Sequence, residues 1–258
     1  TAPWSSGMPD SPRSRAGAEV LEALLLKLRA RDLLGEEEEQ VLRDSVVEIQ
    51  EAAAGRMIVR AGVTLSDSIL LVEGIVARYK DLADGQRQIM ELHVPGDFLD
   101  LHGFLLKRLE HHVGAMTPVR LAIIPHERLR QITEDHPHLA RMLWFSTLID
   151  ASIHREHILS VGRRTALARI AHLLCELYLR LEVVGLAQGG RFPLPLTQAD
   201  LADVTGLTSV HVNRMLKSLR DGDLVTFRGG EVVIQDWEQL QRIGEFSPDY
   251  LYLERRPR

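Results

Sequence analysis

The sequence predicts an α+β fold in which a β-roll is joined by one long helix to a smaller C-terminal domain. Three observations support this prediction. Short β-rich runs punctuated by glycines fill residues 46–125, and a helical apolar repeat then runs from Leu139 to Val161. After it come two closely spaced amphipathic helices and a β-hairpin. Strands at intervals of roughly 8–12 residues are typical of an all-β roll or sandwich, whereas a repeat of about 3.6 residues indicates a helix.

The composition is that of a globular chain with one or two domains. It has 258 residues, of which 45% are hydrophobic and 26% are charged. The net charge of −5 means that any nucleic-acid surface must be a local patch. The single cysteine, Cys175, excludes an intramolecular disulfide and favours a reducing compartment, so we expect a cytoplasmic protein. No run approaches the roughly 18 apolar residues of a spanning helix, so we expect no membrane partner.

The chain divides into four parts. Residues 1–17 are rich in Ser, Pro, Gly and Arg without an apolar period, which predicts a disordered tail. Residues 18–136 hold the roll with its flanking helices, one over 18–30 and one that opens at Gly35. The long helix occupies residues 137–162 and ends at a hinge, Gly162, before the C-terminal domain of residues 163–258.

The long helix is predicted to join two copies of the chain. Its apolar residues are too many for one small roll to cover, so we expect a homodimer whose helices pack as in a coiled coil. The residues expected at this interface are Leu139, Met142, Phe145, Ile149 and Ile153.

Residues 196–220 have the spacing of a helix-turn-helix. Ala202 is small enough for a second helix to cross closely, and Gly206 permits the positive φ of a tight turn. Thr208 can cap the second helix through its side-chain oxygen. The hairpin after it, with a two-glycine turn at 229–230, completes a winged helix. The second helix of such a motif enters the major groove, so double-stranded DNA is the expected partner.

Taken together, these parts resemble the Crp/Fnr family of bacterial transcription regulators. The residues that carry the resemblance are the glycine-punctuated VPGDFLDLHGF at 94–104, the long helix, the helix-turn-helix and the hairpin. The resemblance implies that the roll is a cyclic-nucleotide-binding-like sensor domain and that the long helix is the dimer interface. It also implies a winged helix that reads a palindromic site, RNA polymerase as a partner, and no catalytic site.

The resemblance also assigns roles on the second helix. Arg214 aligns with the family's base-reading arginine and is expected to contact guanine. Val210 stands where many members carry a glutamate, and it can offer only contact with a thymine methyl. Lys217 and Arg228 are expected to meet phosphates. The residues expected to contact DNA are Thr197, Gln198, Thr208, Ser209, Val210, His211, Asn213, Arg214, Lys217 and Arg228.

The sensor domain departs from the family's cyclic-nucleotide pattern. Aligned without gaps, the ribose-binding glutamate and the phosphate-binding Arg-Ser pair are replaced by Leu101, His111 and His112. A cyclic phosphate needs a permanent cation, and histidine is at most partly charged near neutral pH. We therefore expect no cyclic AMP binding and leave a small-molecule effector unidentified. The residues expected at the effector pocket are Gly96, Asp97, Leu101, His111 and His112.

Histidine pairs are the candidate metal or haem ligands. His111 and His112 would point to opposite faces of a strand, and His154 and His157 share a helix face but have no identifiable third ligand. The chain has no cysteine cluster near its N-terminus for an iron–sulfur centre, and Cys175 is expected in the core. We therefore expect no metal and no cofactor.

Two alternative functions stay open. A β-roll could be a cupin-like metalloenzyme, but the roll lacks the H-x-H pair that such a site needs. A ligand-binding regulatory module could instead use its helix-turn-helix to contact protein. Salt-dependent binding to duplex DNA separates this alternative from a DNA-binding regulator, because contacts to phosphates release counterions.

Overall fold

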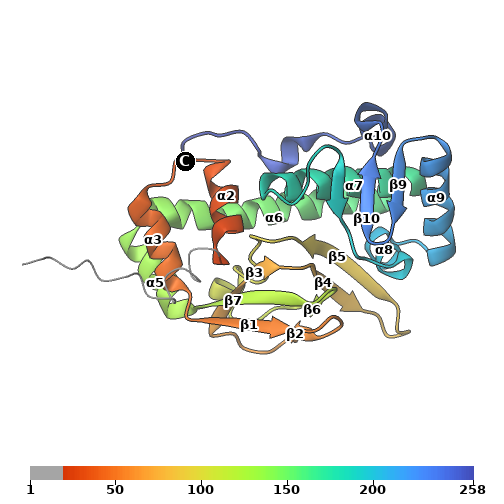
Figure 1. Cartoon of the computed structure of the whole chain (residues 1–258). Coiled ribbons are helices and arrows are strands. Elements are labelled where there is room, and N and C mark those ends of the chain that lie inside the picture. The colour runs from red at the N-terminus through yellow and green to blue at the C-terminus, as the bar shows by residue number, and fades with distance from the viewer. Residues whose placement is uncertain (1–19) are drawn as a thin grey trace, which may run out of the picture.

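The computed structural model describes residues 20–258, so the predicted tail and the start of the first predicted helix lie outside it. Figure 1 shows α6 running along the roll, with α2, α3 and α5 at one end and α8, α9 and α10 at the other. The α-helices are α2 (Glu22–Arg29), α3 (Glu36–Ser45), α4 (Gly103–Leu106), α5 (His126–Asp135), α6 (Pro137–Arg163), α7 (Ala166–Val183), α8 (Gln198–Thr205), α9 (Ser209–Asp221) and α10 (Trp237–Gly244).

The roll consists of two antiparallel sheets, as the glycine-punctuated runs predict. Their strand orders are β1-β7-β3 and β2-β6-β4-β5. The strands are β1 (Glu48–Ala52), β2 (Met57–Val59), β3 (Asp67–Glu73), β4 (Val76–Asp81), β5 (Arg87–His93), β6 (His112–Ala115) and β7 (Val119–Pro125). Apolar side chains from both sheets fill the roll, among them Leu71, Val76, Leu99, Val113 and Leu121. Their burial away from water is the main force that closes the two sheets on each other.

The long helix ends later than the predicted hinge. Gly162 is helical in α6, and the chain turns at Arg164, whose ψ of 149° is extended. Thr165 then caps α7, because its hydroxyl oxygen accepts a hydrogen bond from the Ala168 amide at 3.3 Å. The chain thus turns two residues after the predicted hinge, and the cap of the next helix fixes the turn.

The C-terminal domain is a winged helix. β8 (Arg191–Pro193), β10 (Glu231–Ile234) and β9 (Val225–Arg228) form a sheet in that order, and a 3₁₀ turn (Pro248–Leu251) follows α10. The predicted hairpin turn is confirmed, since Gly229 and Gly230 have φ values of 60° and 77°. A two-residue hairpin turn of this kind requires positive φ at both positions.

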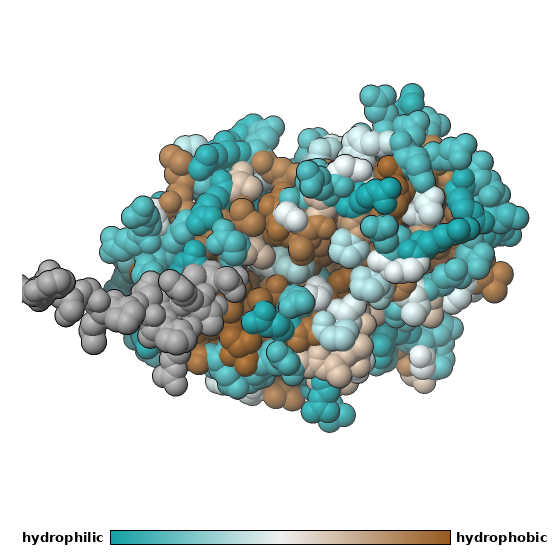
Figure 2. Space-filling view, viewed as in Figure 1, coloured by the Kyte–Doolittle hydropathy of each residue, from teal (hydrophilic) through white to brown (hydrophobic). Residues whose placement is uncertain are grey.

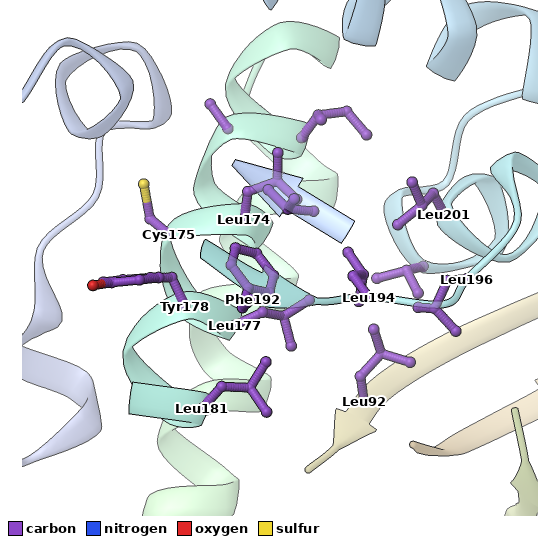
Figure 3. Packing of buried hydrophobic residues seen from close by; sticks show 14 of the residues in the cluster. Leu92, Leu174, Cys175, Leu177, Tyr178, Leu181, Phe192, Leu194, Leu196 and Leu201 are labelled. Carbon is purple, nitrogen blue, oxygen red and sulfur yellow. The ribbon is translucent and has the colours of Figure 1, made fainter. Parts of the chain in front are cut away.

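One apolar core extends from the roll into the winged helix. It contains Ile89 and Leu92 of β5, Ile153 of α6, and Leu174 and Leu177 of α7, all buried. Figure 3 shows Leu92 beside Leu194 and Leu196, which lead into α8. The two domains are therefore packed against each other in this structure.

His138, in the first turn of α6, ties that helix to the N-terminal helices. Its Nδ1 lies 2.7 Å from Glu38 Oε1, and its Nε2 lies 3.3 Å from Asp32 Oδ2. Burial disfavours the charged ring, but the hydrogen bonds to Glu38 and Asp32 outweigh it and raise the pKa of His138. A histidine whose folded pKa is raised stabilises the fold fully below its unfolded pKa and loses this effect as the pH rises through the folded pKa.

We therefore expect His138→Gln to cost about 1 kcal/mol at about pH 6 and less at about pH 8. Urea unfolding of both proteins at several pH values measures the difference. His136→Gln is the control, because His136 is half-buried and forms no ion pair within residues 20–258. A cost for His138→Gln that does not change with pH would contradict this assignment.

Candidate DNA-binding surface and effector cavity

The helix-turn-helix is formed by α8 and α9, and each of its predicted local features is present. Thr197 caps α8, since its hydroxyl accepts from the Asp200 amide at 3.1 Å while Asp200 accepts from the Thr197 amide at 2.7 Å. Gly206 ends α8 with a φ of 66°. Thr208 caps α9 by accepting from the His211 amide at 3.2 Å. The turn and both helix starts are thus fixed by local hydrogen bonds.

The ten predicted DNA contacts lie on one part of the surface. Val212 and Leu219 turn inward from α9, which leaves the opposite face of the helix open. All ten are exposed except His211, which is half-buried, and Val210 is 82% exposed. Asn213 donates to Gln198 Oε1 at 3.1 Å and so joins the second helix to the first. In Figure 2 the end that holds α8, α9 and α10 is largely hydrophilic.

The residues predicted at the dimer interface do not face outward. Leu139 and Met142 have no exposed surface, and Ile149 and Ile153 are only 8% and 5% exposed. Phe145 is partly buried against the C-terminal segment, and the Arg258 guanidinium carbon lies 3.8 Å from the centre of its ring. These residues pack within one chain, so the structure corrects the choice of interface residues.

A different stripe of α6 is left uncovered. Trp144 is 66% exposed, Leu148 48% and Ile158 71%. Together with Ala151 and Arg155 they recur at alternate spacings of four and three residues, which is the spacing of a coiled-coil seam. We call Trp144, Leu148, Ala151, Arg155 and Ile158 the α6 stripe.

The five residues predicted at the effector pocket do not form one site. Gly96, Asp97 and Leu101 line a cavity of about 50 Å³ beside α2, whereas His111 lines another of about 330 Å³ against α6. His112 lines neither cavity. Its ring is tilted by 31° against that of Tyr79, and its Nδ1 accepts from the Ala61 amide at 3.2 Å. Neighbouring strand residues point to opposite faces, and this alternation separates the two histidines.

The larger cavity is the candidate effector site, because it lies between the roll and α6. Its volume falls at the lower end of the range of ligand pockets. It is lined by Arg78, Met90, His102, Glu110, His111, Thr147, Asp150, Ala151 and His154.

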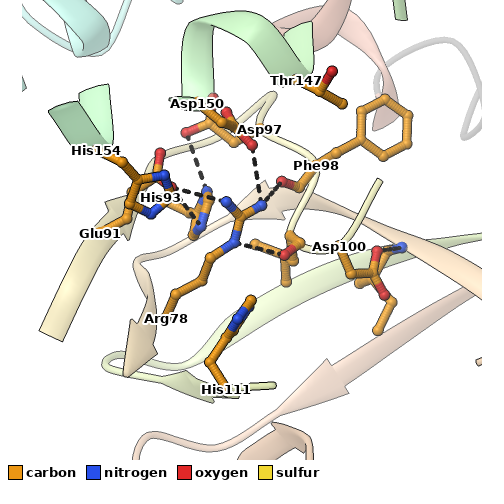
Figure 4. Close-up of polar contacts among 12 residues, drawn as sticks. Arg78, Glu91, His93, Asp97, Phe98, Asp100, His111, Thr147, Asp150 and His154 are labelled. Atoms are coloured by element: carbon orange, nitrogen blue, oxygen red, sulfur yellow. Dashed lines mark hydrogen bonds and ion pairs between the residues drawn. The ribbon is translucent and has the colours of Figure 1, made fainter. Parts of the chain in front are cut away.

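Arg78 lies at the inner wall of this cavity, and four of its five N–H donors are engaged (Figure 4). It donates to Glu91 at 2.9 Å and to Asp150 at 3.1 Å. It also donates to the carbonyl oxygens of Leu99 and Phe98 at 2.9 and 3.2 Å. An arginine with these four partners joins β4, β5, the turn at 98–99 and α6, and has little left to offer a ligand.

The histidines of the cavity carry no charge near neutral pH. Burial, and then the nearby Arg78, lower the pKa of His102 and of His154 to about 4. Burial likewise lowers the pKa of His111, although Glu110 opposes this. The cavity therefore offers neutral rings as hydrogen-bond donors and acceptors.

Asp97 is the second centre of charge, on the side of the roll near α2. It accepts from Lys27 Nζ at 2.5 Å, from Arg180 of α7 at 2.9 Å and from the Val94 amide at 2.8 Å. Burial disfavours the charged carboxylate, but Lys27 and Arg180 outweigh it and hold the pKa of Asp97 well below its usual value. Asp97 thus links the roll to the first helix of the winged-helix domain.

Sequence reasoning missed Arg78, Glu91, Asp150 and Arg180. One pattern in the sequence could have indicated a pair: Arg78 and Glu91 are direct neighbours across β4 and β5, and they carry opposite charges. The partners from α6 and α7 come from distant parts of the chain and had no such signal.

The remaining predicted candidates fall in separate places. His154 lines the larger cavity, whereas His157 lines a different one between β5 and α7. Within residues 20–258, no group of three or more His, Cys, Asp or Glu is arranged to hold a metal ion. Cys175 is buried, and burial raises the pKa of its thiol to about 12. None of the helices in that range is long and apolar enough to cross a membrane.

Two family models match the chain. The model described as a cyclic nucleotide-binding domain matches residues 49–136, and the Crp-like helix-turn-helix domain matches residues 168–243. These matches coincide with the roll and with the winged helix.

Curated relatives and a solved structure agree with the models. The nitrogen fixation regulation protein FixK of Bradyrhizobium diazoefficiens is 33% identical over 62% of this chain and 67% of its own length. The transcriptional activator protein FnrL of Cereibacter sphaeroides is 28% identical over 72% of this chain and 76% of its own length. The structure of FixK2 from Bradyrhizobium japonicum is 27% identical, with a TM-score of 0.70, over 78% of this chain and 99% of that one. This chain therefore belongs to the Crp/Fnr family of bacterial transcription regulators.

Proposed function

We propose that this chain binds a palindromic DNA site as a homodimer and regulates transcription there through contact with RNA polymerase or its exclusion. The observation that carries the proposal is the open face of α9, which is capped at Thr208 and presents Ser209, Val210, Asn213 and Arg214 to solvent. The names of the relatives, a transcriptional activator and a nitrogen fixation regulator, support it. No catalytic step is part of the proposal.

In this mechanism the two α9 helices enter successive major grooves, about 34 Å apart. Arg214 is exposed and forms no ion pair with a described residue. Its guanidinium is therefore free to donate two hydrogen bonds, to O6 and N7 of a guanine. Val210 contacts a thymine methyl. Lys217 and Arg228 contact phosphates, which position the helix without reading sequence.

The α6 stripe is the proposed seam of the homodimer. All of its residues except the half-buried Ala151 are exposed in the single chain, and a second copy would cover them from the same face of its own α6. The buried face of α6, with Leu139 and Met142, holds the helix against its own roll. The two faces of α6 thus serve different contacts.

The larger cavity is proposed to bind an effector other than cyclic AMP. Arg78 is the only arginine that lines it among residues 20–258, and four of its five N–H donors are already used. The three histidines there are neutral near pH 7, because burial lowers the pKa of each ring. A cyclic phosphate would therefore lose its solvation without gaining a charged partner.

Arg214→Ala should relax base preference at one position in each half-site, with a loss of roughly 1–3 kcal/mol of discrimination. Lys217→Ala should instead weaken binding to every sequence alike. It should also reduce the magnitude of the slope of log K against log salt concentration by about one unit for each phosphate contact that a subunit loses. The measurement is titration of each variant against a site selected from random DNA, and against its single-base variants, at several salt concentrations. Binding without a salt slope would favour a helix-turn-helix that contacts protein.

Ile158→Glu should weaken dimerisation by about tenfold or more, because it places two like charges in the seam. Sedimentation equilibrium of the variant and the wild type measures this. Leu105→Glu is the matched control, since Leu105 is 77% exposed on α4, away from the stripe. If the wild type is a monomer that still binds a palindrome tightly, the proposed seam is wrong.

Cyclic AMP should not tighten operator binding, and calorimetry should detect no saturable heat at micromolar concentrations. The reason is the absence of a free cation among the described residues of the larger cavity, since each charge-assisted hydrogen bond to the phosphate is worth about 1.5–3 kcal/mol. The same protein sample must bind its selected site, which shows that it is active. Micromolar affinity for cyclic AMP would overturn this proposal.

A further inference from the structure

The small cavity beside α2 is distinct from the larger one against α6. Helix α2 and Arg31 bound it on one side, and the turn at 96–98, α6, α7 and the C-terminal segment line the rest. Gly96 allows this closeness, because a Cβ there would lie 2.6 Å from the Ala23 carbonyl carbon of α2. The cavity is thus enclosed by parts of the chain that are distant in sequence.

Three cationic side chains converge on this cavity from separate elements. Lys27 comes from α2, Arg31 follows that helix, and Arg180 comes from α7. All three are buried, at 7%, 8% and 6% exposure. Two carboxylates also line the cavity, but Asp150 is already paired with Arg78 and Asp97 with both Lys27 and Arg180. Arg180 is also paired with Glu176, at 2.9 Å, so the positive charge of this lining that has no ion-pair partner is that of Arg31.

Arg31 is the cation of this lining that forms no ion pair with a described carboxylate. Its Nη1 and Nη2 donate to the carbonyl oxygens of Lys27 and Leu251 at 3.0 and 3.2 Å, and its Nε is buried without a partner among residues 20–258. A carbonyl oxygen carries only a partial charge, so it cannot compensate a buried guanidinium as a carboxylate would. Buried charges in proteins are normally paired, so an anionic partner for Arg31 is to be expected.

We propose that this cavity binds one small oxyanion of phosphate size, held by Arg31 together with Lys27 and Arg180. A buried water needs about 10–15 Å³ of free space, so about 50 Å³ accommodates the three to five waters that such an ion would replace. A nucleotide does not fit in this volume. The ligand is therefore free phosphate, or a similar tetrahedral oxyanion.

The acid–base properties of the lining agree with an anion. Burial and the neighbouring cations lower the pKa of Lys27 to about 8, although Asp97 opposes this. Burial likewise lowers the pKa of Arg31 to about 10; Arg180 and Arg258 add to this effect, whereas Asp97 and Asp150 oppose it. A bound anion would relieve the mutual repulsion of these groups.

Binding would connect the roll to the winged helix. The proposed ligands lie in α2, after α2 and in α7, so the anion would bridge the N-terminal part to the domain that carries α9. An ion that binds this arrangement stabilises it over others. An effect of the anion on DNA affinity rests on the proposed function, whereas binding of the anion to this cavity does not depend on it.

The test is calorimetry of the full chain without DNA, titrated with sodium phosphate while sodium chloride holds the ionic strength constant. We expect one saturable site per chain, and affinity at least about tenfold weaker in Arg31→Met. Arg29→Met is the matched control, because Arg29 lies on the same helix and pairs with Glu39 and Glu22 outside the cavity. Arg214→Ala combined with Lys217→Ala controls for phosphate bound at the DNA surface, and should leave the affinity unchanged.

Thermal unfolding gives a second readout on the same proteins. Phosphate should raise the unfolding midpoint of the wild type and of Arg29→Met, but not that of Arg31→Met. Arg31→Gln, which keeps a donor but removes the charge, replaces Arg31→Met if circular dichroism shows that the latter does not fold. Equal affinity in the Arg31 variant, loss of binding in either control, or no saturable binding below about 10 mM would overturn the proposal. Acetate that binds as tightly as phosphate would contradict a tetrahedral oxyanion, and none of these results depends on DNA.

Discussion

The arrangement of this molecule depends on the buried guanidinium of Arg78. The side chain is 2% exposed, and Glu91, one of its two carboxylate partners, has no exposed surface. Removing one partner of such a pair typically costs about 3–5 kcal/mol, because the other charge remains buried and uncompensated. Arg78 therefore requires β4, β5, the turn at 98–99 and α6 to stay together.

Asp97 extends the same constraint to α7. Through Arg180 it makes the first helix of the winged-helix domain part of the charge network of the roll. Gln88 of β5 adds a direct bond to the helix-turn-helix, since it donates to the carbonyl oxygens of Asp203 and Val204 at 2.9 and 3.1 Å. These polar contacts lie around the shared apolar core, and together they leave the open face of α9 and the α6 stripe for outside partners.

The sequence was most informative where structure is local. The cap at Thr208, the turn at Gly206 and the glycine pair of the wing follow from residue types and spacing, and all are present. The first strand of the wing sheet, β8, has no such pattern because it is three residues long. Periodicity identified α6 as a long apolar helix, but it could not tell which apolar residues face the roll and which face outward.

The candidate effector site shows the same division between local and distant information. A gap-free alignment placed Leu101 and His111 in one pocket, whereas the folded chain directs them into two. Arg180 and Lys27 are separated from Asp97 by 83 and 70 residues, and no spacing rule relates positions so far apart. Charge pairs between distant elements become visible only when the packing is known.

The shared core has a practical consequence for any attempt to excise the winged helix. Only Arg164 and Thr165 separate α6 from α7, which leaves almost no linker to cut. A fragment that begins there would separate α8 from β5, on which it packs, while the remaining roll would uncover Leu92 of the shared core. Both pieces would then carry exposed apolar patches of the kind that drives aggregation. The winged-helix domain is consequently not a unit that can be expressed alone without change. An isolated domain would need the apolar residues of the shared core that become exposed to be replaced by polar ones.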